Sequence, residues 1–249
     1  MSDHGLVVML GATSAIAQAY ARRRAASGAR FVLVARRQDR LETIAADLIA
    51  RGAASAATMV MDLAVAADIE PGVATIHRQF GAPDEIVLAY GLLGDQARAE
   101  RDLCAARVVL DVNFTSAALW VLAFIARRDP VRPLTFIVVG SVAGDRGRAA
   151  NVVYGAAKGG LDIFIQGLQH KYAGTTVRLI MVKPGYVDTP MTDAFVKTGP
   201  LWAAPDRIAA DMERAVGRGR RVVYSPWFWR PIMAGIRRLP WFVFRRLKI

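Results

Sequence analysis

Short apolar segments alternate with helix-like stretches along most of this 249-residue chain. The apolar segments span residues 6–10, 31–34, 58–61, 86–89, 134–139, 177–182 and 222–224, and the helix-like stretches span 15–27, 38–51, 67–79, 103–126, 154–172 and 206–216. Strands that alternate with helices are typical of a parallel sheet wound by right-handed crossovers, with both faces covered. The sequence therefore predicts an α/β fold: a single-domain, Rossmann-like, doubly wound parallel sheet of about seven strands with helices on both faces.

The composition favours one globular domain followed by a short extension. Hydrophobic residues make up 54% of the chain and charged residues 22%, and neither repeats nor a Gly/Ser linker divides it. We expect a domain over residues 1–224 and a basic, aromatic extension over 225–249. The single Cys104 excludes an internal disulfide, and the three histidines lack metal-ligand spacing, so no metal is expected. The amino terminus lacks a signal-peptide core, which indicates a cytoplasmic location.

The positive charge of the chain is concentrated in its last part. The formal net charge is +12, but nine basic and no acidic residues follow residue 217, which leaves +3 for the rest. Because the charge belongs to the end of the chain and no recognition motif accompanies it, no nucleic-acid partner is expected. The nine basic residues are Arg218, Arg220, Arg221, Arg230, Arg237, Arg238, Arg245, Arg246 and Lys248.

Aromatic and apolar residues stand between the arginines of this extension. Its apolar runs are interrupted by prolines and stay well below the ~20 residues of a membrane-spanning helix. Trp and Phe mixed with Arg suit the headgroup region of a membrane, and hence a peripheral contact with its inner face. They equally suit a surface packed on the domain or on a neighbouring subunit. The sequence leaves both interpretations open.

A glycine-led turn, residues 11–17, separates the first apolar segment from the first helix. The free N–H groups and the dipole of a helix N-terminus favour a phosphate at such a turn. Ala15 and Ala17 stand where a dinucleotide fingerprint has glycines, so an ordinary strand-to-helix turn remains an alternative. The candidate cofactor-binding residues here are Gly11, Thr13, Ser14, Ala15 and Ile16.

The second apolar segment is followed by Ala35, Arg36 and Arg37, without a carboxylate. An acidic residue at this point favours NADH, whereas an arginine pairs with the 2′-phosphate of NADPH. We therefore predict NADPH as the cofactor through Arg36, with NADH as the second choice. Two solvated arginines at the start of a helix are the alternative interpretation.

Ser141 and the pair Tyr154 and Lys158 are the candidate catalytic groups. Tyr154 and Lys158 are four residues apart and so share one face of a helix. A cation beside a phenol favours the phenolate, so we expect the Tyr154 pKa to fall below its free value of about 10. Tyr154 would then act as a general acid or base. Ser141 follows a strand and is placed to hydrogen-bond the oxygen of a reacting carbonyl.

The candidate residues come directly after different strands. In a parallel α/β sheet, ligands bind at the carboxyl ends of the strands, near the point where strand order reverses. We therefore expect these residues to converge at one edge of the sheet: Gly11, Asp62, Gly91, Ser141, Pro184 and Gly185.

The order of these motifs resembles the short-chain dehydrogenase/reductase family, from residue 5 to about residue 224. The resemblance implies that Tyr154 protonates a substrate carbonyl, that Lys158 lowers the Tyr154 pKa and binds the nicotinamide ribose, and that Ser141 holds the carbonyl. It also implies that Asn113 orders a water for proton relay, and that the enzyme is a homodimer or homotetramer. The further cofactor-binding residues that it implies are Asp62, Leu63, Gly91, Pro184, Gly185, Val187 and Thr189.

A narrower resemblance concerns the substrate. Residues 90–95, residues 143–162 and the basic aromatic extension are similar to the decaprenylphosphoryl-2-keto-erythro-pentose reductase branch. That branch implies reduction of a lipid-linked 2-keto sugar, in concert with a flavin-dependent oxidase. Residues 88–91 depart from the family's Asn-Asn-Ala-Gly and keep only Gly91. Two alternatives stay open: a reductase of another small ketone, and a non-catalytic membrane-surface binding protein on this fold.

Overall fold

A computed structural model describes residues 5–247 and contains one seven-stranded sheet, in the order β3-β2-β1-β4-β5-β6-β9. Every neighbouring pair of strands in this sheet is parallel. The order reverses between β1 and β4, so a crevice for a ligand is expected beyond their carboxyl ends. The strands are β1 (Leu6–Leu10), β2 (Arg30–Ala35), β3 (Ser55–Val60), β4 (Glu85–Leu88), β5 (Leu134–Val139), β6 (Val177–Pro184) and β9 (Val222–Ser225).

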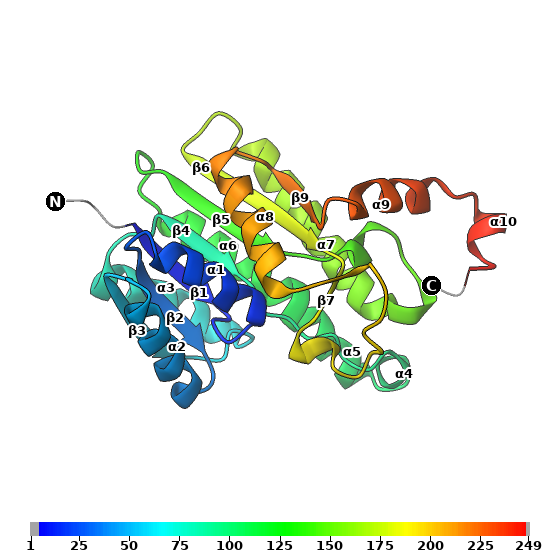
Figure 1. Ribbon diagram of the computed structural model, residues 1–249, viewed down its shortest axis with the longest axis horizontal. Coiled ribbons are helices and arrows are strands. Elements are labelled where there is room, and N and C mark those ends of the chain that lie inside the picture. The colour runs from blue at the N-terminus through cyan, green and yellow to red at the C-terminus, as the bar shows by residue number, and fades with distance from the viewer. Residues whose placement is uncertain (1–4, 248–249) are drawn as a thin grey trace.

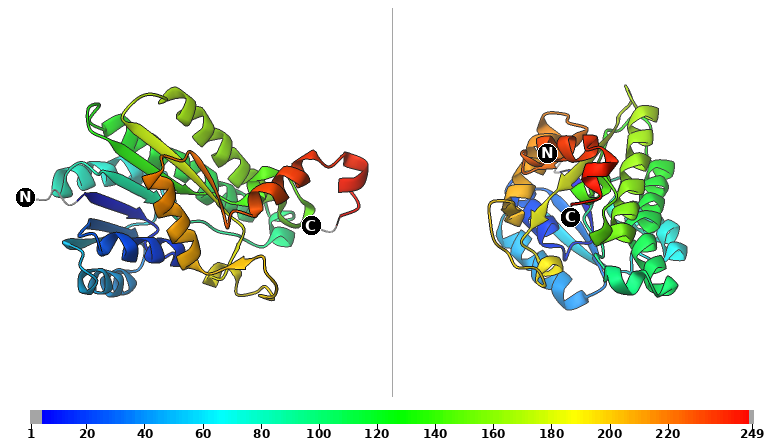
Figure 2. Two further views of the ribbon diagram at one scale, coloured as in Figure 1. Left: turned by 45° about the horizontal axis from the view of Figure 1, so that its top comes forward. Right: turned by 90° about the vertical axis from the view of Figure 1, so that its right-hand side faces the viewer.

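Two layers of helices cover the two faces of the sheet, as Figures 1 and 2 show. One layer packs α1 (Ala15–Ala25), α2 (Gln38–Ala50) and α8 (Pro205–Gly217) on one face. The other packs α3 (Ile69–Phe80), α6 (Ser116–Arg127) and α7 (Val152–Lys171) on the opposite face. The predicted fold class, a doubly wound parallel sheet with helices on both faces, is confirmed.

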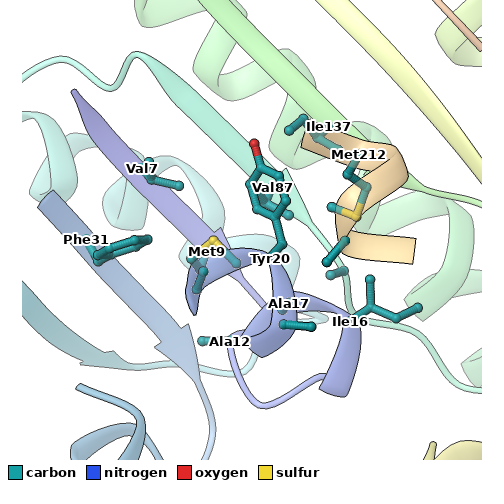
Figure 3. Close-up of a cluster of buried hydrophobic side chains, with 14 of the residues drawn as sticks. Val7, Met9, Ala12, Ile16, Ala17, Tyr20, Phe31, Val87, Ile137 and Met212 are labelled. Carbon is teal, nitrogen blue, oxygen red and sulfur yellow. The ribbon is translucent and has the colours of Figure 1, made fainter. Parts of the chain in front are cut away.

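The first of these cores encloses the side chain of Tyr20 (Figure 3), which belongs to a buried polar pair. Tyr20 of α1 is fully buried among apolar side chains that include Met9 and Met212. Its hydroxyl donates a hydrogen bond of 2.8 Å to Oε1 of Glu85, which is 4% exposed. Burial raises the pKa values of both groups, because a low dielectric disfavours the charged forms. The pair lies at the amino-terminal end of β4, far from the edge that carries the candidate site.

The largest difference from the predicted elements lies in the stretch 103–126. The predicted helix is present and continuous but not regular: α5 (Leu103–Leu110) and α6 are joined by a π-helical turn, Asp111–Thr115, which contains Asn113. Smaller shifts occur at other ends, since β3 begins at Ser55 and α7 at Val152. Three short elements were not predicted, because none is long enough to show periodicity: α4 (Gln96–Ala99), β7 (Tyr186–Val187) and β8 (Trp202–Ala203).

Among the described residues, one helical stretch, Leu103–Arg127, has the length and apolar character of a membrane span. Half of it is buried within the fold, where Trp120 and Phe124 are almost fully enclosed. Core helices of folded domains meet the same criteria, so the stretch is weak support for membrane insertion.

The extension contains α9 (Trp229–Arg238) and α10 (Trp241–Phe244), which project from the body of the domain in Figures 1 and 2. Trp229 and Met233 of α9 are buried against Val142, which follows Ser141. Met1–His4 and residues 248–249 lie outside the described part, and with them Lys248, one of the nine basic residues.

Candidate active site

Gly11 directly follows β1 at the centre of the sheet edge, where only glycine fits. Its φ is +85°, a left-handed conformation that favours glycine. A Cβ built on Gly11 would lie 2.7 Å from the Cβ of Tyr90, which follows β4. The glycine-led turn therefore packs directly against the end of β4, on the two sides of the point where strand order reverses.

The N-terminus of α1 keeps the properties of an anion site. Ser14 occupies the N-cap position, but its side chain makes no capping hydrogen bond, and the first turn contains no acidic residue. The N–H groups of that turn therefore keep their hydrogen-bonding capacity and the positive end of the helix dipole. Ala15 is half-buried, whereas Ile16 and Ala17 are buried in the core, where Ala17 lies close to the sheet. Thr13 accepts a hydrogen bond of 3.0 Å from Gln18 through its carbonyl.

Arg36 and Arg37 differ in their surroundings, although both are exposed at the end of β2. Arg37 is paired with Asp39, with Nη2 and Oδ2 2.5 Å apart. Within residues 5–247, Arg36 makes no ion pair and no side-chain hydrogen bond. Of the two, Arg36 keeps its guanidinium available for a phosphate.

Asp62 and Leu63 follow β3 and lie at the same edge of the sheet. Asp62 is exposed, and its Oδ1 accepts a hydrogen bond of 3.0 Å from the N–H of Ala64. Leu63 is buried, and its carbonyl accepts a hydrogen bond of 3.0 Å from Nε1 of Trp120. These bonds fix the loop after β3 and leave Asp62 exposed at the edge of the sheet.

The π turn brings Asn113 against the loop after β4. Asn113 is 1% exposed; its Oδ1 accepts from the N–H of Leu92 at 3.1 Å, and its Nδ2 donates to the Leu92 carbonyl at 2.6 Å. Nδ2 also donates to the carbonyl of Val109 at 2.8 Å. A Cβ on Gly91 would lie 2.8 Å from Oδ1 of Asn113 and 3.5 Å from Nζ of Lys158, so this glycine permits the close approach. In this geometry the Asn113 side chain holds the loop; its expected role in ordering a water remains a prediction.

Tyr154 and Lys158 lie on one face of α7 beside Ser141. Lys158 is 4% exposed, and its Nζ donates a hydrogen bond of 3.1 Å to the carbonyl of Val139. Nζ lies 5.9 Å from the centroid of the Tyr154 ring. Ser141 caps the short turn Val142–Asp145, where its Oγ accepts from the N–H of Ala143 at 3.0 Å.

The pKa values of this pair differ from the expectation. Burial raises the pKa of Tyr154 to about 12, although the hydrogen bond with Ser141 acts in the opposite direction. Burial lowers the pKa of Lys158 to about 8. The predicted lowering of the Tyr154 pKa is therefore wrong for this geometry. The ammonium group is directed to the Val139 carbonyl, while burial disfavours the phenolate.

The turn after β6 carries the remaining candidate residues, and a residue of α9 that sequence reasoning missed packs against it. Gly185 lies against Trp229 of α9: a Cβ there would overlap the indole ring. Nε1 of Trp229 is buried and has no hydrogen-bond partner within residues 5–247. Val187 pairs with Ala203 between β7 and β8. The aromatic content of the extension was its only sequence signal, since no motif marks Trp229.

Pro184 and Thr189 complete this side of the edge. Pro184 pairs with Ser225 at the end of β6, and the N–H of Gly185 donates to the Ser225 carbonyl at 3.1 Å. Thr189 begins a short turn and exchanges hydrogen bonds with Thr192. No group of three or more potential metal ligands occurs among the residues that the structure describes.

The family model for short chain dehydrogenases matches residues 5–199. An uncharacterized oxidoreductase of Mycobacterium tuberculosis is 41% identical over 249 residues, which cover 99% of both chains. An uncharacterized oxidoreductase of Streptomyces coelicolor is 40% identical over 250 residues, covering 98% of this chain and 96% of its own. The chain therefore belongs to the short chain dehydrogenase family and is an NAD(P)H-dependent oxidoreductase.

A solved structure supports the same fold. A short chain dehydrogenase/reductase from Burkholderia phymatum, in complex with NAD, matches with a TM-score of 0.83 at 19% identity. The match covers 93% of this chain and 92% of that one. It thus extends from the sheet edge described above to both layers of helices.

Proposed function

We propose that the protein reduces a carbonyl to a secondary alcohol, and carries out the reverse reaction, with NADPH as the preferred cofactor and NADH as the second choice. The observation that carries the proposal is the convergence of Ser141, Tyr154 and Lys158 beside Gly91 and the uncapped N-terminus of α1. These groups combine proton-transfer chemistry with an anion site at one edge of the sheet.

The residues at this edge fit a dinucleotide. The Gly11 turn and the free N–H groups of α1 suit a pyrophosphate, and Arg36 suits a 2′-phosphate. Asp62 with Leu63, Gly91, and the segment from Pro184 to Thr189 would hold its two ends. The nicotinamide supplies a hydride when bound.

The chain's own residues handle the oxygen of the substrate. Tyr154 donates its proton to the carbonyl oxygen as the alcohol forms, and accepts it in the reverse direction. The Ser141 hydroxyl donates a hydrogen bond to that oxygen and fixes its place. Lys158, with a pKa lowered to about 8 by burial, holds a charge that responds to pH within the working range. Asn113 holds the Gly91–Leu92 loop against this group.

The test is fluorescence titration with NADPH and NADH on the wild type, Arg36→Ala and Arg37→Ala. We expect NADPH to bind more tightly than NADH, and only Arg36→Ala to remove the difference, because Arg37 is held by Asp39. Tyr154→Phe should abolish carbonyl reduction and leave NADPH binding intact. Full turnover by Tyr154→Phe would overturn the mechanism, and absence of any nucleotide binding would favour a non-catalytic binding protein.

For the substrate, we propose a lipid-linked carbonyl compound of the polyprenylphosphoryl 2-keto sugar class, with a small ketone as the alternative. A cavity of about 680 Å³ between α7 and α10 supports this proposal. Trp241 and Phe244 supply apolar lining, Arg148 and Arg245 supply positive charge, and none of the described residues that line the cavity is acidic. An isoprenoid chain and its phosphate need both kinds of surface.

We further propose that α10 and its neighbours contact the inner face of the membrane. Trp227 and Trp241 are each 69% exposed, and Phe242 is 60% exposed. Exposed aromatic residues interspersed with arginines suit an anionic headgroup region. A homodimer or homotetramer, the expectation from the family, stays part of the proposal, and so does a cytoplasmic location.

A further inference from the structure

A buried cluster of charged groups lies behind the candidate catalytic residues. Nζ of Lys183 donates hydrogen bonds to Oδ1 of Asp145 at 2.7 Å and to Oδ2 of Asp162 at 2.8 Å. The hydroxyl of Tyr224 donates to the second oxygen of Asp145 at 2.7 Å. The side chains of Lys183, Asp145 and Asp162 are 5%, 1% and 12% exposed, so water screens the three charges very little.

Each member of this Lys183 cluster lies on a segment that carries a residue of the site or holds one by a hydrogen bond. Asp145 closes the turn that Ser141 caps, and Asp162 lies one helical turn after Lys158 on α7. Lys183 precedes Pro184 and Gly185 on β6, and Tyr224 precedes Ser225, whose carbonyl binds the Gly185 N–H. The cluster thus joins the four segments that the site depends on: the Ser141 turn, α7, the end of β6 and the end of β9.

Stability alone is a poor reason for such a cluster. Buried ion pairs lose much of their attraction to desolvation, and apolar replacements of similar volume are often neutral or stabilising. One oxygen of Asp162, Oδ1, is buried with no hydrogen-bond partner among the described residues, which costs further free energy. Burial alone would lower the pKa of Lys183, but Asp145 and Asp162 raise it above its ordinary value, so the lysine stays charged.

We propose that the Lys183 cluster is a positioning device for the reaction. Its directional bonds fix the Ser141 turn and α7 relative to the turn after β6, which would hold the nicotinamide end of the cofactor. Hydrogen bonds to a charged group have preferred directions that apolar packing lacks. Since a displacement of about 1 Å can cost on the order of a hundredfold in rate, such bonds favour function at the expense of stability. This inference rests on the proposed function.

The structure offers a matched pair of substitutions to test it. Tyr224→Phe removes a tyrosine–carboxylate bond of 2.7 Å inside the cluster. Tyr20→Phe removes an equivalent bond of 2.8 Å to Glu85 at the opposite end of the sheet. Lys183→Met removes the central cation while keeping much of its volume. Thermal unfolding measures what each change costs in stability.

The functional readout is the binding of NADPH compared with 2′,5′-ADP, which lacks the nicotinamide half. We expect Tyr224→Phe and Lys183→Met to weaken NADPH about tenfold and to leave 2′,5′-ADP within about twofold, because only the nicotinamide side depends on the cluster. Tyr20→Phe should lower the melting temperature as much as Tyr224→Phe does, yet change neither affinity.

If the ratio of NADPH affinity to 2′,5′-ADP affinity were the same in Tyr224→Phe and Tyr20→Phe, the inference would be overturned and the cluster would be purely structural. If Lys183→Met fails to fold, Tyr224→Phe still decides the question, since it removes a single hydroxyl. If the wild type binds 2′,5′-ADP but not NADPH, the assignment of the nicotinamide side is wrong and the inference falls. If the wild type binds neither, the proposed function fails first, and the inference with it.

Discussion

The contact between Gly185 and Trp229 allows a quantitative test of how the extension packs on the domain. A Cβ on Gly185 overlaps the indole, and Trp229 is 4% exposed. Gly185 is not among the glycines with positive φ, so close approach rather than backbone freedom requires the glycine. We predict that Gly185→Ala lowers the free energy of unfolding by about 2 kcal/mol, because a rigid ring must shift in a packed core.

The double variant isolates the contact. Trp229→Ala should cost about 3–5 kcal/mol through the cavity that it leaves. In that background Gly185→Ala should cost nothing, which gives a coupling of about 2 kcal/mol in urea unfolding followed by circular dichroism. Gly167→Ala on α7 is the control, since a Cβ there meets no atom of the described residues within 4 Å. The packing would be refuted if Gly185→Ala cost the same with and without the indole.

Two further predictions concern pH and the membrane. Burial lowers the pKa of Lys158 to about 8 in the folded protein. Between about pH 8 and about pH 10 the unfolded chain therefore binds more protons at this residue than the folded protein does, so the contribution of Lys158 to stability rises with pH. Urea unfolding of Lys158→Met should show a rise smaller by about 2 kcal/mol over that window; an unchanged rise would contradict the burial. The double variant Trp241→Ser with Phe242→Ser should co-sediment less with anionic vesicles and unchanged with neutral ones. Val131 is also highly exposed, so Val131→Ser is the control and should sediment as the wild type does. Equal sedimentation of the wild type, the double variant and Val131→Ser would exclude membrane contact through α10.

The alternation of apolar segments was enough to predict the sheet, because a strand buried on both faces must be apolar throughout. The residues after the strands followed from topology, since parallel strands end at one edge. The π turn at Asn113 was not predictable: the residues on either side suit a regular α-helix, and a π turn has no local signature. The spacing of Tyr154 and Lys158 gave their shared face but neither the depth of burial nor the direction of the ammonium group, so the predicted pKa shift was wrong.

The contacts that sequence reasoning missed are those between residues distant in the chain. Lys183 and Asp145 are separated by 38 residues, and Arg146 and Ile236 by 90. Each of these residues, taken alone, has the sequence context of a solvated side chain or an ordinary apolar one. Only the packed structure shows that the Lys183 cluster is enclosed and that Trp229 covers Gly185.

The extension divides into two parts that differ in their dependence on the domain. In α9, Trp229 and Met233 pack on Val142, and Arg146 donates to the carbonyl of Ile236, so this helix is tied to the Ser141 turn and to Gly185. The contact of α10 is a looser one, through the Arg146 guanidinium 3.7 Å from the centroid of Phe244. Removal of residues 240–249 should therefore leave NADPH affinity within about twofold, because this single cation–π contact does not involve the turn at Gly185. Removal of residues 227–249 should lower both the NADPH affinity and the melting temperature, because it uncovers the turn at Gly185. If titration showed full NADPH affinity after this longer deletion, α9 would not contribute to the cofactor site.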